Sequence, residues 1–124
     1  TVKRVPVGKI PCSVAINPKT RRIYVVNYGD ETLSVVDLNS NHVIATVPVG
    51  KHPQHVAVDA VRNRVFVADV HGNDVTVIDG SRNTVVGKVE AGSNPYAIAI
   101  DPGSGKIFVA NYGRPWITAV AFEK

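Results

Sequence analysis

Short stretches of alternating hydrophobic and polar residues run along this chain, and a polar turn interrupts them every few residues. In the middle of the sequence such stretches cover 55–59, 64–69, 74–79 and 84–89, and Val is the commonest residue in them. Alternation with a period of two, β-branched residues and turns rich in Gly and Asn favour β-strands. No segment has a convincing helical period, so the pattern predicts an all-β chain.

The four-strand pattern occurs three times, with a period of 42 residues and no insertion. Residues 5–46 and 47–88 share 14 identities over 42 aligned positions. Three series of equivalent residues mark the register: Gly8, Gly50 and Gly92; Pro11, Pro53 and Pro95; Tyr24, Phe66 and Phe108. Four short strands in a unit of about 40 residues are typical of one blade of a β-propeller.

The repeat resembles the YVTN-type β-propeller repeat along the whole chain. The motifs that carry this resemblance are IYVVNYG (23–29), VFVADVH (65–71) and IFVANYG (107–113), followed by VVD, VID and the divergent AVA. The resemblance implies a propeller fold. Similar repeats belong to surface-layer and exported proteins and to lyase and lactonase relatives, which implies an extracellular or periplasmic location.

The two ends of the chain are one strand out of phase with the repeat. Residues 1–8 align with the fourth strand of the first unit, and the last unit ends on an aligned third strand, WITAVAF (116–122). We therefore predict twelve strands in three four-stranded blades, with the outer strand, residues 1–7, offset to the N-terminus. The blades are expected to cover 5–46, 47–88 and 89–124.

Three blades are too few to close a propeller, because propellers typically have four to eight. An open arc also exposes apolar blade faces and an unpaired strand edge. We expect a head-to-tail homodimer with a six-bladed ring, in which residues 2–7 of one copy pair with 116–121 of the other. A fragment of a longer propeller, excised or engineered, is the alternative, and the absence of Met even at position 1 fits trimming.

Composition narrows the classes of partner. The net charge is +4, and much of the basic charge lies in the turns 19–22 and 62–64, which we interpret as solvated. A nucleic-acid surface needs clustered basic and aromatic residues, and a membrane span needs about 18 apolar residues, so neither partner is expected. Cys12 is the only cysteine, and we interpret it as a small buried hydrophobic residue rather than a nucleophile.

Candidate binding residues fall in two sets of loops, those before each first strand and those between each second and third strand. Because strand direction alternates, both sets lie on one face of a propeller, and loops on a rigid scaffold commonly carry function. The candidate ligand-binding residues on this face are Tyr28, His55, His71, Tyr96, Tyr112, Arg114 and Trp116. Packing between blades is the alternative role for the aromatic side chains.

The second blade collects three of the four histidines. His52, His55 and His71, with Asp69, form a candidate set of ligands for Zn²⁺ or a similar divalent metal, and ordinary surface histidines are the alternative interpretation. Asp69 also shares a repeat position with Asn27 and Asn111. At that position we expect these side chains to cap a turn by accepting hydrogen bonds from backbone N–H groups.

No catalytic residues are predicted, because the chain has no nucleophile elbow, phosphate-binding loop or dinucleotide fingerprint. The sequence favours a non-enzymatic binding or scaffold protein without a cofactor. A metal-dependent enzyme that uses the histidine-rich loops of the second blade, by resemblance to lyase or lactonase propellers, is the alternative.

Overall fold

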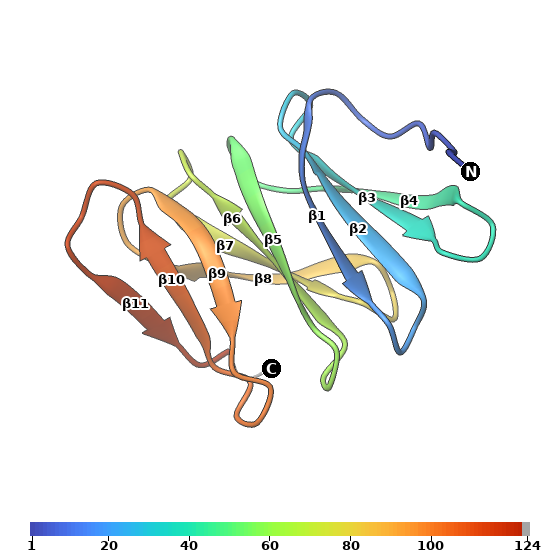
Figure 1. Cartoon of the computed structure of the whole chain (residues 1–124). Helices are drawn as coiled ribbons and strands as arrows, with labels where there is room; N and C mark the ends of the chain where they lie inside the picture. Colours follow the sequence, from blue (N-terminus) through green and yellow to red (C-terminus); the bar gives the residue numbers. More distant parts are fainter. Residues whose placement is uncertain (123–124) are drawn as a thin grey trace.

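The computed structural model describes residues 1–122, which form eleven β-strands in three antiparallel sheets (Figure 1). Blade 1 contains β1 (Pro11–Asn17), β2 (Arg22–Asn27), β3 (Thr32–Asp37) and β4 (His42–Pro48). Blade 2 contains β5 (Pro53–Asp59), β6 (Arg64–Asp69), β7 (Asp74–Asp79) and β8 (Thr84–Glu90). Blade 3 contains β9 (Pro95–Ile100), β10 (Ile107–Asn111) and β11 (Ile117–Val120). No helix long enough to cross a membrane occurs in this part of the chain.

Each sheet keeps its strands in chain order, and the pairing repeats from blade to blade. The first two strands are joined with a register shift at the same place, between Pro11 and Ser13 in blade 1 and between Pro53 and His55 in blade 2. The sheets stand side by side in chain order, and the first strand of the middle blade, β5, contacts both β1 and β9 (Figure 1). This arrangement confirms the predicted all-β propeller blades and the predicted strand order.

Two hydrophobic cores lie between the blades. The first joins Tyr24, Val26, Leu33 and Val35 of blade 1 to Val56, Val65, Val67 and Ile78 of blade 2. The second joins Phe66, Ala68, Val75 and Val77 of blade 2 to Ile98, Ile107 and Val109 of blade 3. Alternation along each strand sends successive side chains to opposite faces, so blade 2 contributes to both cores. Burial of this apolar surface is the main stabilising contribution to the fold.

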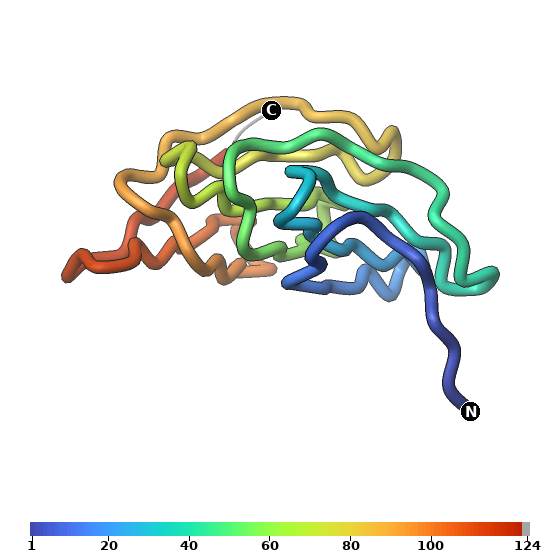
Figure 2. The backbone as a smooth tube through the Cα atoms, turned by 90° about the horizontal axis from the view of Figure 1, so that it is seen from above, coloured from blue at the N-terminus to red at the C-terminus, as the bar shows by residue number. Residues whose placement is uncertain are grey.

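The structure has eleven strands where the sequence predicted twelve, because residues 1–7 do not form a strand. This segment projects away from the body as an arm (Figure 2). The third strands β3 and β7 already pair with β4 and β8, and the N-terminus lies at the opposite end of the arc from β11 (Figure 1). Within residues 1–122 the arm therefore does not reach β11, the strand that its repeat position would extend, and the third sheet has three strands.

Candidate functional site

The loops predicted to share one face do lie together. In each blade a backbone N–H of the loop after the second strand donates to a carbonyl of the loop before the first strand. The three bonds are Tyr28 N to Ile10 O (2.9 Å), Val70 N to His52 O (3.1 Å) and Tyr112 N to Asn94 O (2.8 Å). Donors and acceptors are spaced by 42 residues, so one loop geometry is built three times.

Buried polar side chains fix these loops to the blades. Asn27 Oδ1 accepts from Gly8 N (3.1 Å), and Asn27 Nδ2 donates to Ser34 Oγ (2.8 Å). Gly8 has no room for a side chain, because a Cβ there would lie 2.6 Å from Asn27 Cγ. The oxygen accepts from a backbone N–H, as predicted, but this N–H belongs to the loop before β1 and not to the turn that follows Asn27.

Blade 2 builds the same cap with an acid. Asp69 is fully buried, and its carboxylate accepts from Gly50 N (3.0 Å) and from the hydroxyl of Thr76. Burial, with a smaller contribution from neighbouring Asp74, raises the pKa of the Asp69 carboxyl to about 7. In blade 3 Asn111 hydrogen-bonds with Thr118 Oγ1 (2.9 Å). Asp69 is therefore the one member of the series whose charge changes near neutral pH.

A cluster of rings lies where the loops of blades 1 and 2 meet. His52 stacks on Tyr28, with ring centroids 5.2 Å apart and planes at 25°, and His71 meets His52 edge-on at 3.9 Å. A polar recess of about 570 Å³ beside this cluster is lined by His71, Lys51, Lys88, Glu31 and Asp74, among others. These side chains carry both signs of charge, so the recess has no single preference for an anion or a cation.

The proposed metal ligands are not gathered in one place. His55 lies on β5 with its Nε2 3.3 Å from the carbonyl oxygen of Ile98, and Asp69 is engaged with Gly50 and Thr76. Only His52 and His71 are in ring contact. Residues 1–122 contain no group of three or more His, Cys, Asp or Glu side chains placed to hold a metal ion, so the geometry does not support that set as a metal centre.

The candidate ligand-binding residues fall into separate groups. Tyr28 and His71 belong to the ring cluster of blades 1 and 2 through His52. Tyr96 and Tyr112 form a second cluster in blade 3, with ring centroids 5.4 Å apart. Arg114 and Trp116 follow Tyr112 closely in the sequence, and both are exposed. His55 belongs to neither group, because it reaches across from β5 to β9.

The expectation that Cys12 is buried is wrong. Cys12 is exposed at the start of β1, with its Sγ 3.6 Å from the carbonyl oxygen of Pro53. The side chain belongs to neither of the two hydrophobic cores. Partial burial of the thiol raises its pKa, which keeps it protonated and makes it a poor nucleophile at neutral pH.

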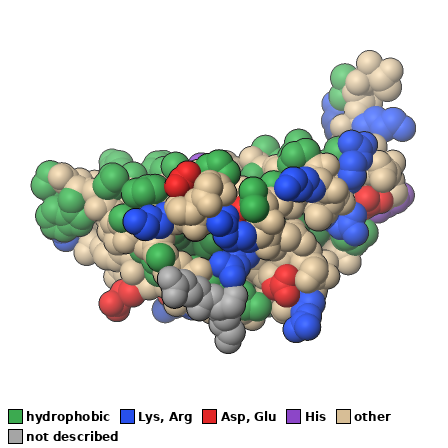
Figure 3. Space-filling view, turned by 90° about the horizontal axis from the view of Figure 1, so that it is seen from below, with side chains coloured by type: hydrophobic (Ala, Val, Ile, Leu, Met, Phe, Trp, Pro, Cys, Tyr) green, Lys and Arg blue, Asp and Glu red, His purple; other side chains and the backbone are tan. Residues whose placement is uncertain are grey.

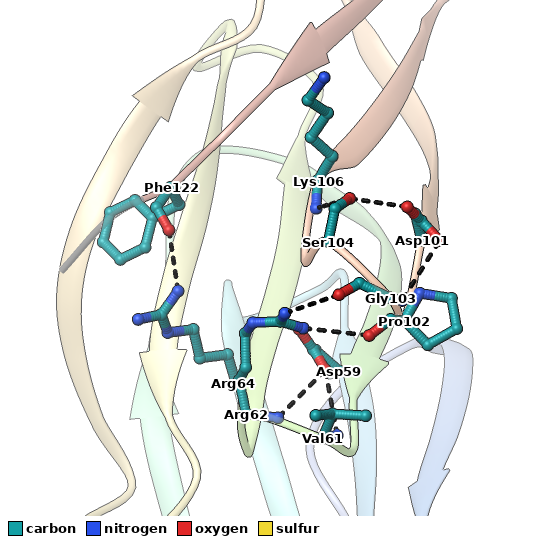
Figure 4. Close-up of polar contacts among 10 residues, drawn as sticks. All are labelled: Asp59, Val61, Arg62, Arg64, Asp101, Pro102, Gly103, Ser104, Lys106 and Phe122. Atoms are coloured by element: carbon teal, nitrogen blue, oxygen red, sulfur yellow. Dashed lines mark hydrogen bonds and ion pairs between the residues drawn. The ribbon is translucent and has the colours of Figure 1, made fainter.

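The opposite end of the blades holds a polar contact that sequence reasoning missed. Arg62 forms an ion pair with Asp59 (3.2 Å) and donates to the carbonyl oxygens of Pro102 (3.2 Å) and Gly103 (3.1 Å) in blade 3 (Figure 4). Gly105 leaves the space for it, since a Cβ there would lie 2.7 Å from Arg62 Cζ. The interpretation of this turn as merely solvated is therefore wrong.

Arg64 makes a second contact of this kind. Its Nη1 donates to the carbonyl oxygen of Phe122 (2.8 Å), and its guanidinium lies 5.3 Å from the centroid of the Phe122 ring (Figure 4). Both arginines thus hold blade 3 against blade 2. Only the three-dimensional packing brings residues 40 to 58 positions apart into contact, so spacing in the sequence gives no signal for it.

Both end faces of the three-blade arc are open and apolar. On blade 3 a shallow apolar hollow of about 310 Å³ is lined by Ala97, Ile98, Ala99, Phe108, Ala110 and Ile117. On blade 1, Val14 and Ile16 are 64% and 51% exposed. Figure 3 shows the molecule from below, with hydrophobic side chains along one rim, Lys and Arg side chains nearer the middle, and the arm projecting from the body.

No protein-family model matches this chain, and no curated protein is similar to it in sequence. Solved structures of propeller proteins are similar in fold. Hydrazine synthase of Kuenenia stuttgartiensis matches with a TM-score of 0.84 and 22% identity, over 97% of this chain and 36% of that chain. The Cps50 (Swd1) β-propeller domain of Myceliophteria thermophila matches with a TM-score of 0.76 and 14% identity, over 94% of this chain and 38% of that chain.

The dihydro-heme d1 dehydrogenase NirN, in complex with DHE, matches with a TM-score of 0.74 and 19% identity, over 88% of this chain and 25% of that chain. At these identities the likeness shows the fold alone. It confirms the propeller fold, whereas the resemblance to YVTN repeats rests on the sequence motifs alone. The chain spans between a quarter and two fifths of the length of these structures.

Proposed function

We propose that this chain is a non-enzymatic β-propeller scaffold, in which two copies join head to tail in a six-bladed ring. The ring presents its loop face to a protein, glycan or small ligand. One observation supports the ring. The open faces of blades 1 and 3 match the two sides of the interface between neighbouring blades, which the chain already forms twice.

The open face of blade 3 repeats the faces that blades 1 and 2 bury. Phe108 is equivalent to Tyr24 and Phe66, which are 0% and 1% exposed. Ile117 is equivalent to Leu33 and Val75, which are both fully buried, yet Ile117 is 64% exposed. These positions are apolar in all three blades. Blade 2 buries them against blade 3, so the open face of blade 3 requires a further blade packed against it in the same way.

The open face of blade 1 offers that cover. Its exposed Val14 is equivalent to Val56 and Ile98, which are 3% and 7% exposed because they pack on the preceding blade. A second copy of the chain therefore supplies the matching half. Two copies carry two such pairs of faces, so head-to-tail contact closes at six blades, within the usual range, whereas three copies give nine.

The arm supplies the fourth strand of the partner's blade 3. Residues 1–7 align with β4 and β8, and β11 presents the edge that β3 and β7 use for those strands. By the register of Val35 with Ala45 and of Val77 with Gly87, Ala119 pairs with the partner's Lys3. Pairing satisfies backbone groups that an open edge leaves free.

Sedimentation velocity tests this proposal against its main alternative. Further blades of a longer polypeptide would cover the same two faces, which fits the partial coverage of the similar structures. We expect a stable species of twice the 13.3 kDa chain mass. A species of 13.3 kDa at every concentration up to 100 μM contradicts the dimer.

A pair of variants locates the contact. Phe108→Glu places a charge on the open face of blade 3, so the dimer is expected to dissociate. Val85→Glu is the matched control, because Val85 is an exposed apolar residue (41%) on β8, an outer strand of the middle blade and remote from both end faces. Equal loss of dimer in the two variants contradicts an interface at blade 3.

A further inference from the structure

We infer that Asp101 of one copy forms an ion pair with the partner's Arg21, and that this pair selects head-to-tail contact. The inference rests on the ring proposed above and deepens it by naming the groups that set partner choice. The relevant turns follow the inner strands β1, β5 and β9. These turns share one geometry, with positive φ at Arg21 (60°), Asn63 (55°) and Gly105 (78°).

The contact between blades 1 and 2 shows what this turn position does. Asn17 is fully buried at the end of β1, and its Nδ2 donates to Oδ1 of Asn63 in the next blade (3.1 Å). The residue that ends an inner strand therefore meets the residue with positive φ in the turn of the following blade. Here both groups are neutral amides.

The contact between blades 2 and 3 repeats this arrangement with charges. Asp59 stands where blade 1 has Asn17, and Gly105 stands where blade 2 has Asn63. Arg62 fills the space that Gly105 leaves, bonded to Asp59 on one side and to blade 3 carbonyls on the other (Figure 4). The same two repeat positions therefore again lie at the polar contact across the seam, the boundary between two neighbouring blades. At this seam the positive charge comes from Arg62 of blade 2.

At the third seam the same two positions hold opposite charges. Asp101 is equivalent to Asn17 and Asp59, and the partner's Arg21 is equivalent to Asn63 and Gly105. Asp101 is exposed in the single chain, and its carboxylate accepts only from its own turn, from Ser104 Oγ (2.7 Å) and Gly103 N (3.3 Å). An acid thus lies at the end of the face that blade 3 offers.

Arg21 lies at the matching end of the face that blade 1 offers. It is exposed, and its Nε and Nη2 donate to Asn39 Oδ1 at 3.2 and 3.1 Å. Within residues 1–122 neither Asp101 nor Arg21 lies within ion-pair distance of an opposite charge, although Arg62 attracts the Asp101 carboxylate from farther away and contributes to lowering its pKa. A guanidinium whose partner is a neutral amide gains the attraction of an opposite charge when a carboxylate approaches it.

The pair also disfavours wrong contacts. Two copies that met through the same face would leave both Asp101 carboxylates without a guanidinium, or both Arg21 guanidinium groups without a carboxylate, so these contacts would lack the attraction between opposite charges. Head-to-tail contact joins acid to base at both seams of the ring. Because each ring contains two such pairs, a change at one position counts twice in the stability of the dimer.

Charge reversal in the intact chain tests the inference. Asp101→Arg or Arg21→Asp alone places like charges at both seams, and we expect the dimer dissociation constant from sedimentation to rise at least tenfold. An equimolar mixture of the two variants restores an acid opposite a base at both seams. We expect the mixture to form a heterodimer with nearly the wild-type dissociation constant.

Gentler variants keep the test valid if a reversed turn misfolds by circular dichroism. Asp101→Asn keeps the capping oxygen, as Asn17 does in blade 1, and Arg21→Gln keeps a donor to Asn39. For these we expect a three- to tenfold weaker dimer whose dissociation constant no longer depends on salt between 50 and 500 mM.

Two results are distinguishable. Wild-type protein that dimerises, with single variants that dimerise equally well or a mixture that does not recover, overturns the ion pair and leaves the ring intact. Wild-type protein that stays monomeric overturns the ring proposal and the ion pair with it.

Discussion

Tyr28 of blade 1 stacks on His52 of the loop that enters blade 2, with ring centroids 5.2 Å apart. At the proposed seam the equivalent residues are Tyr112 and the partner's Ile10. Ile10 is 63% exposed and has a φ of 52°, a conformation that is unfavourable for a β-branched residue. The proposed ring would give this exposed and strained residue an apolar neighbour, since Tyr112 is 68% exposed.

Replacing Ile10 with Asn is expected to have opposite effects on the single chain and on the dimer. Asn is the residue at the equivalent position 94 and tolerates positive φ, so the chain in a monomeric Phe108→Glu background should gain about 1 kcal/mol in the free energy of unfolding. Loss of the contact with Tyr112 should weaken the dimer of otherwise wild-type protein about fivefold, which corresponds to about 1 kcal/mol.

Urea unfolding and sedimentation velocity measure these two effects. Val61→Asn, at another exposed apolar residue (57%), is the control and should leave the dimer unchanged. A variant at position 10 that dimerises as tightly as wild type argues against the contact with Tyr112.

Asp69 predicts a dependence of stability on pH. Its folded pKa of about 7 lies above the unfolded value of 3.8, so the folded state binds more protons between these values. The contribution of Asp69 to stability is therefore greatest below about pH 4, falls as pH rises to about 7 and is level above it. Asn27 shows that an amide satisfies the same partners, so Asp69→Asn should remove this slope.

At pH 8 the gain from Asp69→Asn is expected to be on the order of 2–4 kcal/mol, from 1.36 kcal/mol for each pH unit. Urea unfolding at pH 5 and pH 8, at one protein concentration, measures it. Asp30→Asn, at an exposed residue of the loop face, is the control. An unchanged pH slope in the Asp69 variant means that the carboxyl is ionised in the folded protein at pH 5.

Gly105 predicts a loss of stability with an internal control. Gly105 and Gly113 have nearly the same φ, 78° and 79°, but a Cβ at 105 meets Arg62 whereas a Cβ at 113 has nothing within 4 Å. Gly113→Ala should cost about 1–2 kcal/mol from backbone strain alone. Gly105→Ala should cost about 1–3 kcal/mol more, because Arg62 must leave its carbonyl partners.

Thermal unfolding with a van't Hoff analysis compares the two variants. Equal losses would show that the Arg62 side chain can move aside at little cost, and that its contacts with blade 3 contribute little to the free energy of unfolding.

The fold was predictable because each blade repeats the same pattern of hydrophobic and polar residues. Period-two alternation marked the strands of blade 2 to within one or two residues of β5 to β8, and the 42-residue register located Asn27 and Asp69 as caps. Both features are local, since a strand and its turn lie within a few residues. The twelfth strand was the exception, because residues 1–7 lie at the opposite end of the arc from β11, the strand that their repeat position would extend.

The site was less predictable because it depends on side-chain direction across blades. His55 lies three residues from His52, but the register shift between Pro53 and His55 sends it across to Ile98 rather than to the other histidines. Arg62 was interpreted as solvated because its partners lie 40 residues away. Composition and spacing hold no information about such contacts.

Disulfide trapping tests the ring most directly. In a Cys12→Ser background, Ala119→Cys with Lys3→Cys places two thiols directly opposite each other across the proposed strand pair, a separation that suits a disulfide. The control, Ala119→Cys with Arg4→Cys, is one residue out of register, so its side chains point to opposite faces. Both double variants are oxidised at low protein concentration and analysed by denaturing gel electrophoresis without reductant.

We expect a cross-linked species of twice the chain mass for the first pair and little for the control. Absence of the cross-linked species, or equal amounts from both pairs, contradicts a ring closed by the N-terminal strand of a second copy.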